Sequence, residues 1–254
     1  MRVTVIIANK NYYEFLPLAL SSVLNQTYKE YKICVVDASD DFEKFKESVA
    51  KSFNLDSSSL VEESNKNCTY FSIDGHDFIH VTIENTFPSN LRNIGIQATL
   101  DNTDVYVILD ADDEMKPTKI QRIVETIQLS PKEIGVVYAD HETLNSVTGE
   151  KNIERREPYD VLRLKDECII HSGAGITKNA LLVAKDSFGY YDSTMRTCED
   201  YDLWMRISKK FMIVHLAEVL SLVRVQPQNS TATVSKDTWQ RDWVRVHQKN
   251  VNKV

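Results

Sequence analysis

The sequence lacks any apolar run that approaches the length of a membrane-spanning helix. Its first apolar stretch, residues 3–8, is too short for the hydrophobic region of a signal peptide and is followed by the polar residues Asn9-Lys10-Asn11. We interpret this stretch as a β-strand, and we expect membrane contact to be peripheral at most.

Cysteine is scarce, and the four cysteines show no paired spacing: Cys34, Cys68, Cys168 and Cys198. This scatter argues against a disulfide framework and against a zinc site, both of which need cysteines in pairs. We expect reduced thiols in a cytoplasmic protein, where disulfides are rare.

Positive charge is in deficit, because 30 Lys and Arg residues stand against 37 Asp and Glu residues, for a formal net charge of -7. A broad nucleic-acid surface needs a basic face, so we expect no nucleic-acid partner. A phosphate-containing substrate remains compatible, because a metal ion can bridge two anions.

The chain also lacks internal repeats, low-complexity tracts and linkers rich in Gly, Pro or Ser. Its 254 residues suffice for one large α/β domain or two small ones. With 42% hydrophobic and 26% charged residues, the composition is that of a soluble globular protein.

Apolar runs of strand length alternate with apolar residues at helical spacing between residues 3 and 138. The expected strands are residues 3–8, 33–36, 79–83, 105–109 and 134–138. The expected helices are residues 16–24 and 42–53, one marked by Leu91, Ile94 and Ala98, and one opened by Pro117. This alternation predicts an α/β fold with a mostly parallel, doubly wound sheet and helices on both faces.

The remainder of the chain is less regular. We expect helices at residues 177–187, 199–209 and 236–247, and strands at residues 211–216 and 219–225. Two polar stretches carry no periodicity: residues 145–158 are interpreted as a hairpin or loop, and residues 54–76 as an irregular surface insertion.

Polar residues stand where the expected strands end: Asn9, Asp37, Asp110 and Asp140. Ligands of parallel α/β sheets bind outside the carboxyl ends of the strands, so these residues mark the expected site. Asp37, with Asp40 and Asp41 behind it, can accept hydrogen bonds from a nucleotide or form an Asx turn.

The strand at residues 105–109 ends in three carboxylates within four residues, at Asp110, Asp112 and Asp113. Like charges this close repel, and their desolvation is costly unless a cation neutralises them. Mg²⁺ and Mn²⁺ prefer carboxylate and phosphate oxygens, so the motif predicts a metal that carries a phosphorylated substrate. The alternative is a solvated acidic turn that caps the next helix.

A second acidic segment, Glu199-Asp200, opens an expected helix in which Asp200, Leu203 and Trp204 share one face. A carboxylate on the buried side of a helix suits a general base. The alternative is a capping arrangement, with Thr197 as N-cap and the acidic residues beside the positive end of the helix dipole.

Two further residues have a functional and a structural interpretation. Arg92, expected in the first turn of its helix, can hold a phosphate or a carboxylate, or can be a surface arginine. His171, in a segment of small residues, can face an acceptor or can be a satisfied structural histidine.

Taken in chain order, these segments resemble the family 2 glycosyltransferases of the GT-A fold. The resemblance extends from residue 3 to about residue 231. The matching segments are residues 3–11, 15–28, 35–37, 92–95, 109–113, Pro117, 188–192 and 199–204.

The resemblance implies a role for each matched residue. It makes Asp200 the catalytic base and Asp112 the direct ligand of a divalent metal, Mn²⁺ or Mg²⁺. The residues that it implies in nucleotide-sugar binding are Ala8, Asn9, Asp37, Arg92, Asp110, Ala111 and Glu199. Asp113 receives no role.

This sequence departs from the family pattern at two places. The family often has a second Asp after the position of Asp37, where this chain has Ala38. The family's late segment often carries a metal-approaching His, where this chain offers Gln226. We therefore expect a metal held mainly by the acidic motif and the pyrophosphate.

The family activity implied here is metal-dependent transfer of a sugar, with inversion, from a nucleotide-diphospho-sugar to an acceptor hydroxyl. The expected donor is a UDP-sugar, and the expected acceptor is a saccharide or a lipid-linked saccharide in polysaccharide or glycoconjugate synthesis. Residues 1–235 would form one domain, with a nucleotide-binding half (1–115) and an acceptor-side half (116–235).

Residues 236–254 form an expected C-terminal helix and tail. The helix is basic and carries two tryptophans, so it can contact a lipid surface or pack on the domain. The expected location is cytoplasmic, and the expected place of any peripheral contact between this helix and the membrane is the inner face.

Three other protein classes fit parts of the sequence. A sugar nucleotidyltransferase usually has a glycine-rich or basic signature after its first strand, which Ala8-Asn9-Lys10-Asn11 lacks. A phosphatase with a nucleophilic Asp would place that Asp at the same point. A catalytically silent nucleotide-sugar or carbohydrate-binding module would need neither acidic segment.

Overall fold

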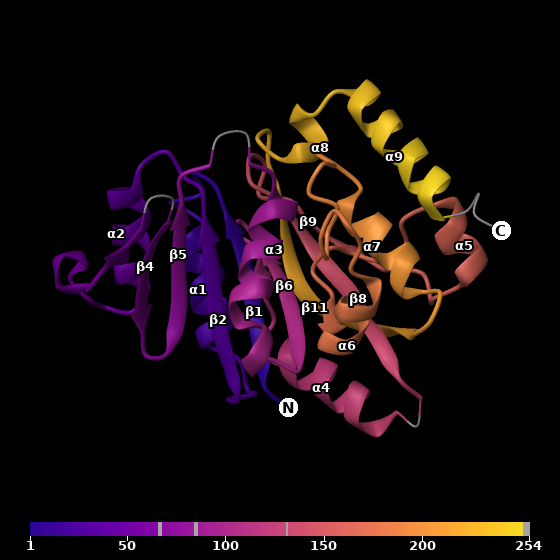
Figure 1. Cartoon of the computed structure of the whole chain (residues 1–254), viewed down its shortest axis with the longest axis horizontal. Coiled ribbons are helices and arrows are strands. Elements are labelled where there is room, and N and C mark those ends of the chain that lie inside the picture. The colour runs from indigo at the N-terminus through magenta and orange to yellow at the C-terminus, as the bar shows by residue number, and fades with distance from the viewer. Residues whose placement is uncertain (66–67, 84–85, 131, 251–254) are drawn as a thin grey trace.

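A computed structural model describes residues 1–65, 68–83, 86–130 and 132–250. A single eleven-stranded sheet runs through it, in the order β3-β4-β5-β2-β1-β6-β10-β8-β11-β7, with β9 paired to β8 (Figure 1). The strands are β1 (Val3–Asn9), β2 (Tyr31–Asp37), β3 (Glu63–Ser64), β4 (Cys68–Ile73), β5 (His76–Val81), β6 (Val105–Asp110), β7 (Glu114–Met115), β8 (Ile134–Asn145), β9 (Lys151–Glu154), β10 (Gly175–Thr177) and β11 (Met212–Val225).

Helices cover both faces of the sheet, as the sequence predicts. The α-helices are α1 (Leu16–Leu24), α2 (Phe42–Ser52), α3 (Pro88–Thr99), α4 (Lys119–Leu129), α5 (Val161–Asp166), α6 (Lys178–Ala184), α7 (Glu199–Ile207), α8 (Ser230–Thr233) and α9 (Lys236–Asn250). Two 3-10 turns, η1 (Ser57–Ser59) and η2 (Leu100–Asn102), complete the elements of the described residues.

The central strand β1 is buried on both of its faces. Val3, Val5 and Ile7 pack into the core shared with α1, α2 and α4, whereas Ile6 packs into the core shared with α3, α6 and α7. This division follows from the two-residue period of a strand, which sends alternate side chains to opposite faces. A parallel strand covered on both faces needs the continuous apolar run that the sequence shows.

Parallel pairing brings the strand ends together at one edge. β1 pairs in parallel with β2 and β6, and β2 pairs in parallel with β5. The register sets Asn9 beside Asp37 and Ala8 beside Asp110. The expected gathering of Asn9, Asp37 and Asp110 is therefore confirmed.

Asp140 is an exception to this pattern. The strand predicted to end at residue 138 continues as β8 to Asn145, so Asp140 lies within a strand and not at its end. It accepts a hydrogen bond from the backbone N–H of Arg156, and His215 Nε2 lies 2.8 Å from its Oδ1. The long strand forms because β9 and β11 pair with its distal half, beyond the reach of local sequence patterns.

The interpretation of residues 54–76 as an irregular insertion holds for residues 54–62, which contain only the turn η1, and is wrong for the described residues 63–64 and 68–76, which form strands and the turn between them. β4 pairs antiparallel with β5, and Phe71 and Phe78 stack with ring centroids 5.1 Å apart. The polar residues of this stretch occupy the exposed face of an edge hairpin. Its apolar residues are too few to show a strand period, but they suffice to bury one face.

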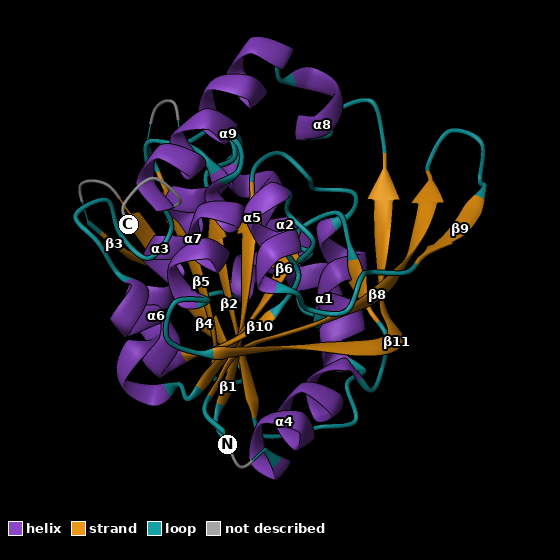
Figure 2. Cartoon of the chain, turned by 90° about the vertical axis from the view of Figure 1, so that its right-hand side faces the viewer, coloured by secondary structure: helices purple, strands orange, loops and turns teal. Residues whose placement is uncertain are grey.

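The polar segment after β8 forms the expected hairpin, with β9 as its returning strand (Figure 2). The two strands expected at residues 211–216 and 219–225 are one strand, β11, with register shifts between Leu216 and Ser221. Short β10 and α5 were not predicted, because three and six residues are too few to display a period.

The C-terminal helix α9 packs on the domain, against α7 (Figure 1). Val246 is fully buried in the core, and Asp242 and Asn250 are buried beside it. Among the described residues, no helix combines the length and apolarity needed to cross a bilayer.

Candidate active site

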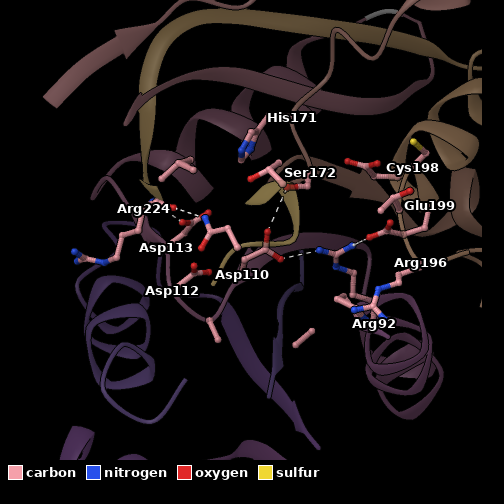
Figure 3. Close-up of a pocket in the computed structure, with 18 of the residues that line it drawn as sticks. Arg92, Asp110, Asp112, Asp113, His171, Ser172, Arg196, Cys198, Glu199 and Arg224 are labelled. Carbon is pink, nitrogen blue, oxygen red and sulfur yellow. Dashed lines mark hydrogen bonds and ion pairs between the residues drawn. The ribbon is translucent and has the colours of Figure 1, made fainter. Parts of the chain in front are cut away.

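The acidic motif lies in the turn after β6, where its three carboxylates have different surroundings (Figure 3). Asp110 is the most open, with 35% of its side chain exposed. Asp112 is buried and accepts a hydrogen bond from Gln226 Nε2 at 2.7 Å. Asp113 is buried and accepts from the backbone N–H of Arg224 at 2.9 Å, which ties the turn to β11.

Burial and mutual repulsion raise the proton affinity of this motif. Burial, and then the charge of Asp110, raise the pKa of Asp112 to about 6. The same two causes raise the pKa of Asp113 well above its usual range. Burial lowers the pKa of the neighbouring Lys119 to about 8, and its ammonium group donates to Ser221 Oγ and not to a carboxylate of the motif. Three carboxylates thus lie close together in a largely buried turn, which favours a bound cation.

Arg92 connects the two acidic segments. Its guanidinium donates to Asp110 Oδ1 and to Glu199 Oε1, both at 2.7 Å, and only 4% of its side chain is exposed (Figure 3). Burial opposes its charge, but Asp110 and Glu199 raise its pKa above the usual value. The surface-arginine interpretation is wrong, and Arg92 lies in the second turn of α3, not the first, because α3 begins at Pro88.

Glu199 and Asp200 open α7 and line the same cavity as the acidic motif. Burial, and then the neighbouring Asp200, raise the pKa of Glu199 to about 7, against the opposing effect of Arg92. Burial likewise raises the pKa of Asp200. A buried carboxylate with a raised pKa beside a cavity is suited to accept a proton.

The expected capping by Thr197 does not occur. The N-cap of α7 is Cys198, in the left-handed conformation at φ 58° and ψ 16°, and no side chain caps the helix there. Thr197 instead donates its hydroxyl to Asp242 of α9. The expected placement of Glu199 and Asp200 in the first turn is confirmed.

Two adjoining cavities lie at this edge of the sheet. The first, of about 310 Å³, is lined by the acidic motif, Arg92, His171 and the Glu199-Asp200 pair. The second, of about 650 Å³, is lined by residues 8–15 and by parts of α3 and the late chain. Ala8, Tyr12, Pro88 and Arg196 line both, so the two cavities adjoin and form one site of the size that small ligands occupy.

Asn9 and Asp37 form a buried network at the floor of this edge. Asp37 accepts hydrogen bonds from Asn9 Nδ2 at 2.5 Å and from Ser39 Oγ at 2.6 Å, and His80 Nδ1 lies 2.6 Å from its Oδ2. Ser39 N also donates to Asp37, as in the Asx turn weighed above. Asp41 caps α2 through Lys44 N. A nucleotide-binding role of Asn9 and Asp37 stays a prediction.

His171 is both structurally bonded and placed at the first cavity. Its Nδ1 accepts from the backbone N–H of Gly173 at 3.0 Å, and its ring lies 4.4 Å from that of His141. Burial, and then His141 and nearby cations, lower its pKa well below the usual value, so the ring is neutral. A neutral ring that accepts at Nδ1 carries its proton on Nε2.

The acidic motif fits a divalent cation that shares its coordination with a substrate. No group of three or more His, Cys, Asp and Glu side chains in the described ranges could enclose a metal alone. Mg²⁺ and Mn²⁺, however, take one or two carboxylates and complete their shell with water and phosphate oxygens. Asp112, which has no cationic partner within ion-pair distance among the residues that the structure describes, and Asp110, which is paired with Arg92 but 35% exposed, both line the first cavity and meet that requirement.

Several cavity residues were not predicted from the sequence. Tyr12 lines both cavities, and burial and the three motif aspartates raise its pKa to about 12. Arg196 lines both cavities with its guanidinium 5.6 Å from the Phe87 ring. Ser172 donates to Asp110 at 3.4 Å. The position of Tyr12 just after a strand end was the one available signal for these three.

The fold and the site together define an α/β protein with a metal-compatible acidic motif at the carboxyl edge of its sheet, of the GT-A type. The model of the family described as "Glycosyl transferase family 2" matches residues 4–182. The chain therefore belongs to glycosyl transferase family 2, which confirms the resemblance found in the sequence.

One curated relative is an uncharacterized glycosyltransferase (alr2836) of Nostoc sp. strain PCC 7120. It is 32% identical over 139 residues, which cover 54% of this chain and 36% of the relative. The chain thus spans about a third of the length of that protein.

Solved structures of similar fold include residues 1–349 of S. aureus TarS. The complex with UDP-GlcNAc has a TM-score of 0.72 at 14% identity, over 98% of this chain and 67% of that one. The complex with UDP has a TM-score of 0.69 at 15% identity, over 100% of this chain and 66% of that one. These likenesses confirm the predicted fold class.

Proposed function

We propose that this chain transfers a sugar from a nucleotide-diphospho-sugar, with a UDP-sugar as donor, to a hydroxyl of a saccharide or lipid-linked saccharide. One observation carries the proposal: buried Arg92 holds the acidic motif and the Glu199-Asp200 pair at the same cavity. The UDP and UDP-GlcNAc complexes of TarS, whose fold this chain shares, support the choice of donor.

The donor would occupy both cavities. The larger cavity, beside Tyr12 and Asn9, has room for the nucleoside, and the smaller one would hold the diphosphate and the sugar. Asp112, with Asp110 beside it, would hold Mn²⁺ or Mg²⁺, and this cation when bound would neutralise the diphosphate leaving group. Arg196, at the junction of the cavities, adds positive charge toward the same group.

Asp200 would act as the general base of the reaction. It accepts the proton of the acceptor hydroxyl, whose oxygen attacks the anomeric carbon from the face opposite the leaving nucleotide. The configuration at that carbon is thereby inverted. Glu199 would assist through Arg92, because their ion pair fixes the first turn of α7 relative to Asp110.

We place this reaction in polysaccharide or glycoconjugate synthesis on the cytoplasmic side of the membrane. The membrane would be touched only peripherally, because the basic helix α9 is one-sided: Val246 is buried, whereas Trp243 and Val244 are partly exposed. Binding to vesicles that contain acidic lipids, with Trp243→Ala as the comparison, tests that contact.

The test of the function is a donor screen. Thermal shift with Mn²⁺ across a panel of nucleotide sugars should show stabilisation by one donor, through binding to the folded state alone. Release of nucleoside diphosphate from that donor, in the presence of saccharide acceptors, then establishes transfer. Stabilisation by a donor with no release of nucleoside diphosphate, whichever acceptor is added, would instead indicate a catalytically silent binding module. Release of inorganic pyrophosphate would indicate a nucleotidyltransferase.

Asp112→Ala should weaken metal-dependent donor binding. The substitution removes the carboxylate that we assign to the metal, so calorimetry with donor plus Mn²⁺ should show at least about a tenfold weaker Kd, or about 1.4 kcal/mol. Asp237→Ala, on the exposed surface of α9, is the matched control and should bind as the unchanged protein does. Equal binding by the Asp112 variant would refute the assignment.

The pH dependence of turnover should show an acid limb. Burial raises the pKa of Asp200, and a base must be ionised to accept a proton, so kcat should fall as the pH drops through that raised pKa. Measurements at saturating concentrations of donor and metal separate this effect on kcat from the effect of Asp112 protonation on donor binding. Arg92→Met removes the cation that lowers the pKa of Asp200 and should move the limb to higher pH. A kcat that is constant down to pH 4 would exclude Asp200 as the base.

A further inference from the structure

Helix α9 holds the segment that carries the proposed base, and its hydrogen bonds with that segment are made by residues other than Trp239, the α9 residue that lines the first cavity. The segment runs from Asp192 to Asp202 and includes Arg196, Glu199 and Asp200. α9 lies directly against α7, the helix that this segment opens (Figures 1 and 2). α9 contacts this segment at its middle and at both of its ends, and these contacts fix the position of the segment.

Asp242 of α9 holds the middle of the segment. Its Oδ2 accepts three hydrogen bonds at 3.1 Å each, from the backbone N–H groups of Arg196 and Thr197 and from the Thr197 hydroxyl. Its Oδ1 accepts from Arg241 at 3.0 Å, and only 1% of the residue is exposed. A buried carboxylate with this many donors is ordered together with the backbone that it binds.

The backbone next to Asp242's partners is strained. Cys198, directly after Thr197, has φ 58°, a conformation that a non-glycine residue adopts only when its surroundings impose it. It is the N-cap of α7, and no side chain caps the helix from that position. Asp242 therefore holds the turn that directly precedes Glu199 and Asp200.

Both ends of the segment are also attached to α9. Lys249 Nζ lies 2.8 Å from Asp192 Oδ2 and 3.1 Å from Asp202, and Asn250 donates to Asp202 at 2.9 Å. Arg245 donates to Asp192 at 2.8 Å. Asp192 and Asp202 are fully buried, so these partners are needed to compensate their charge.

We propose that Asp242 is a positioning residue for the transfer reaction, which acts through the backbone at residues 196–199. It sets where Asp200 and the Arg196 side chain meet the cavity, while touching neither donor nor acceptor. This inference rests on the proposed role of Asp200. The hydrogen bonds from residues 196 and 197 to Asp242, which we call the Asp242 clamp, are a property of the fold, and their effect can be measured without any substrate.

The kinetic test compares three variants. Asp242→Ala should lower kcat by about 10- to 100-fold, the cost of a small misplacement of a catalytic group, with donor KM within about twofold. Asp242→Asn keeps a side-chain oxygen that can accept the same three bonds, and it should restore most of kcat. Asp237→Ala removes an exposed carboxylate of α9 and should behave as the unchanged protein. The acid limb of the pH profile should move in Asp242→Ala alone.

Amide hydrogen exchange at residues 196–200 gives the second readout. Exchange there should accelerate in Asp242→Ala and not in Asp237→Ala, whether or not a donor is known. If the protein turns over no nucleotide sugar, the proposed function is wrong. The exchange data still test whether the Asp242 clamp orders residues 196–200. A folded Asp242→Ala protein with unchanged kcat and unchanged exchange would overturn the inference.

A fourth variant, Thr197→Val, covers the case in which Asp242→Ala does not fold. This change removes the hydroxyl that bonds to Asp242 and to the Cys198 thiol, and it preserves the shape of the side chain. We expect a several-fold lower kcat and faster exchange at residues 198–200. Unchanged values of both in this variant would overturn the inference as well.

Discussion

Asp200→Asn should lower kcat by about 10²- to 10⁴-fold and leave donor binding unchanged. This is the range that a positioned general base contributes, and the amide that replaces the carboxylate has no comparable affinity for a proton. The change is isosteric and retains an oxygen able to accept from Tyr201 N, the bond that Asp200 makes in the structure. Steady-state kinetics, together with calorimetry of donor plus Mn²⁺, measure the two effects separately.

The control for this substitution is Asp237→Asn, which changes an exposed carboxylate by the same chemistry and should keep full turnover. A variant at Asp200 with near-normal turnover would show that another group takes the proton. A variant that loses donor binding and turnover in equal measure would place Asp200 on the donor and not on the acceptor side.

Arg92→Met should reduce the free energy of unfolding by about 3–5 kcal/mol. Removing one partner of a buried ion-pair network leaves the others uncompensated, and here Asp110 and Glu199 would both lose their cation. The loss of folding stability should be measured by urea unfolding, with the linear extrapolation made at a pH above the raised pKa of Glu199, about 7.

Arg122 supplies a matched control, since it also bridges two carboxylates, Glu125 and Glu218. Its side chain is 38% exposed, so solvent screens the pairs and the freed carboxylates return to water. Arg122→Met should therefore cost far less stability than Arg92→Met. Equal losses in the two variants would show that the Arg92 network contributes no more than a surface pair.

The Arg92 variant also separates stability from function. At a temperature where it stays folded, the loss of its bonds to Asp110 and Glu199 should lower transfer further, because the two acidic segments are then free to move apart. The rate per folded molecule is the quantity to compare.

The strand–helix alternation of the first half was predictable because its signals are local. The run Val105–Asp110 is apolar at every position before its terminal Asp, and β1 sends apolar side chains to both faces of the sheet. Such periods are imposed by burial on one or both faces and can be read within a single element. The acidic motif was identified for the same reason, by its attachment to a buried strand.

The second half was predicted less well because its elements depend on distant partners. β10 has three residues and exists because it inserts between β6 and β8. The Thr197 hydroxyl, which the sequence favours as a helix cap, instead bonds to Asp242, 45 residues further along the chain, and the N-cap is the left-handed Cys198. No local pattern encodes a contact of that separation.

Residue types and their order were sufficient to establish the fold class, the acidic strand end and the family. Residue types indicate the chemistry, because closely spaced carboxylates at the end of an apolar strand favour a bound cation once the strand is buried. Tertiary structure alone decided which cation meets which carboxylate: Arg92 is buried between Asp110 and Glu199, and α9 supplies the partners of Asp192 and Asp202. Burial and pairing are properties of three-dimensional neighbours, so the environment that raises the pKa of Asp200 could not be inferred from its position in the chain.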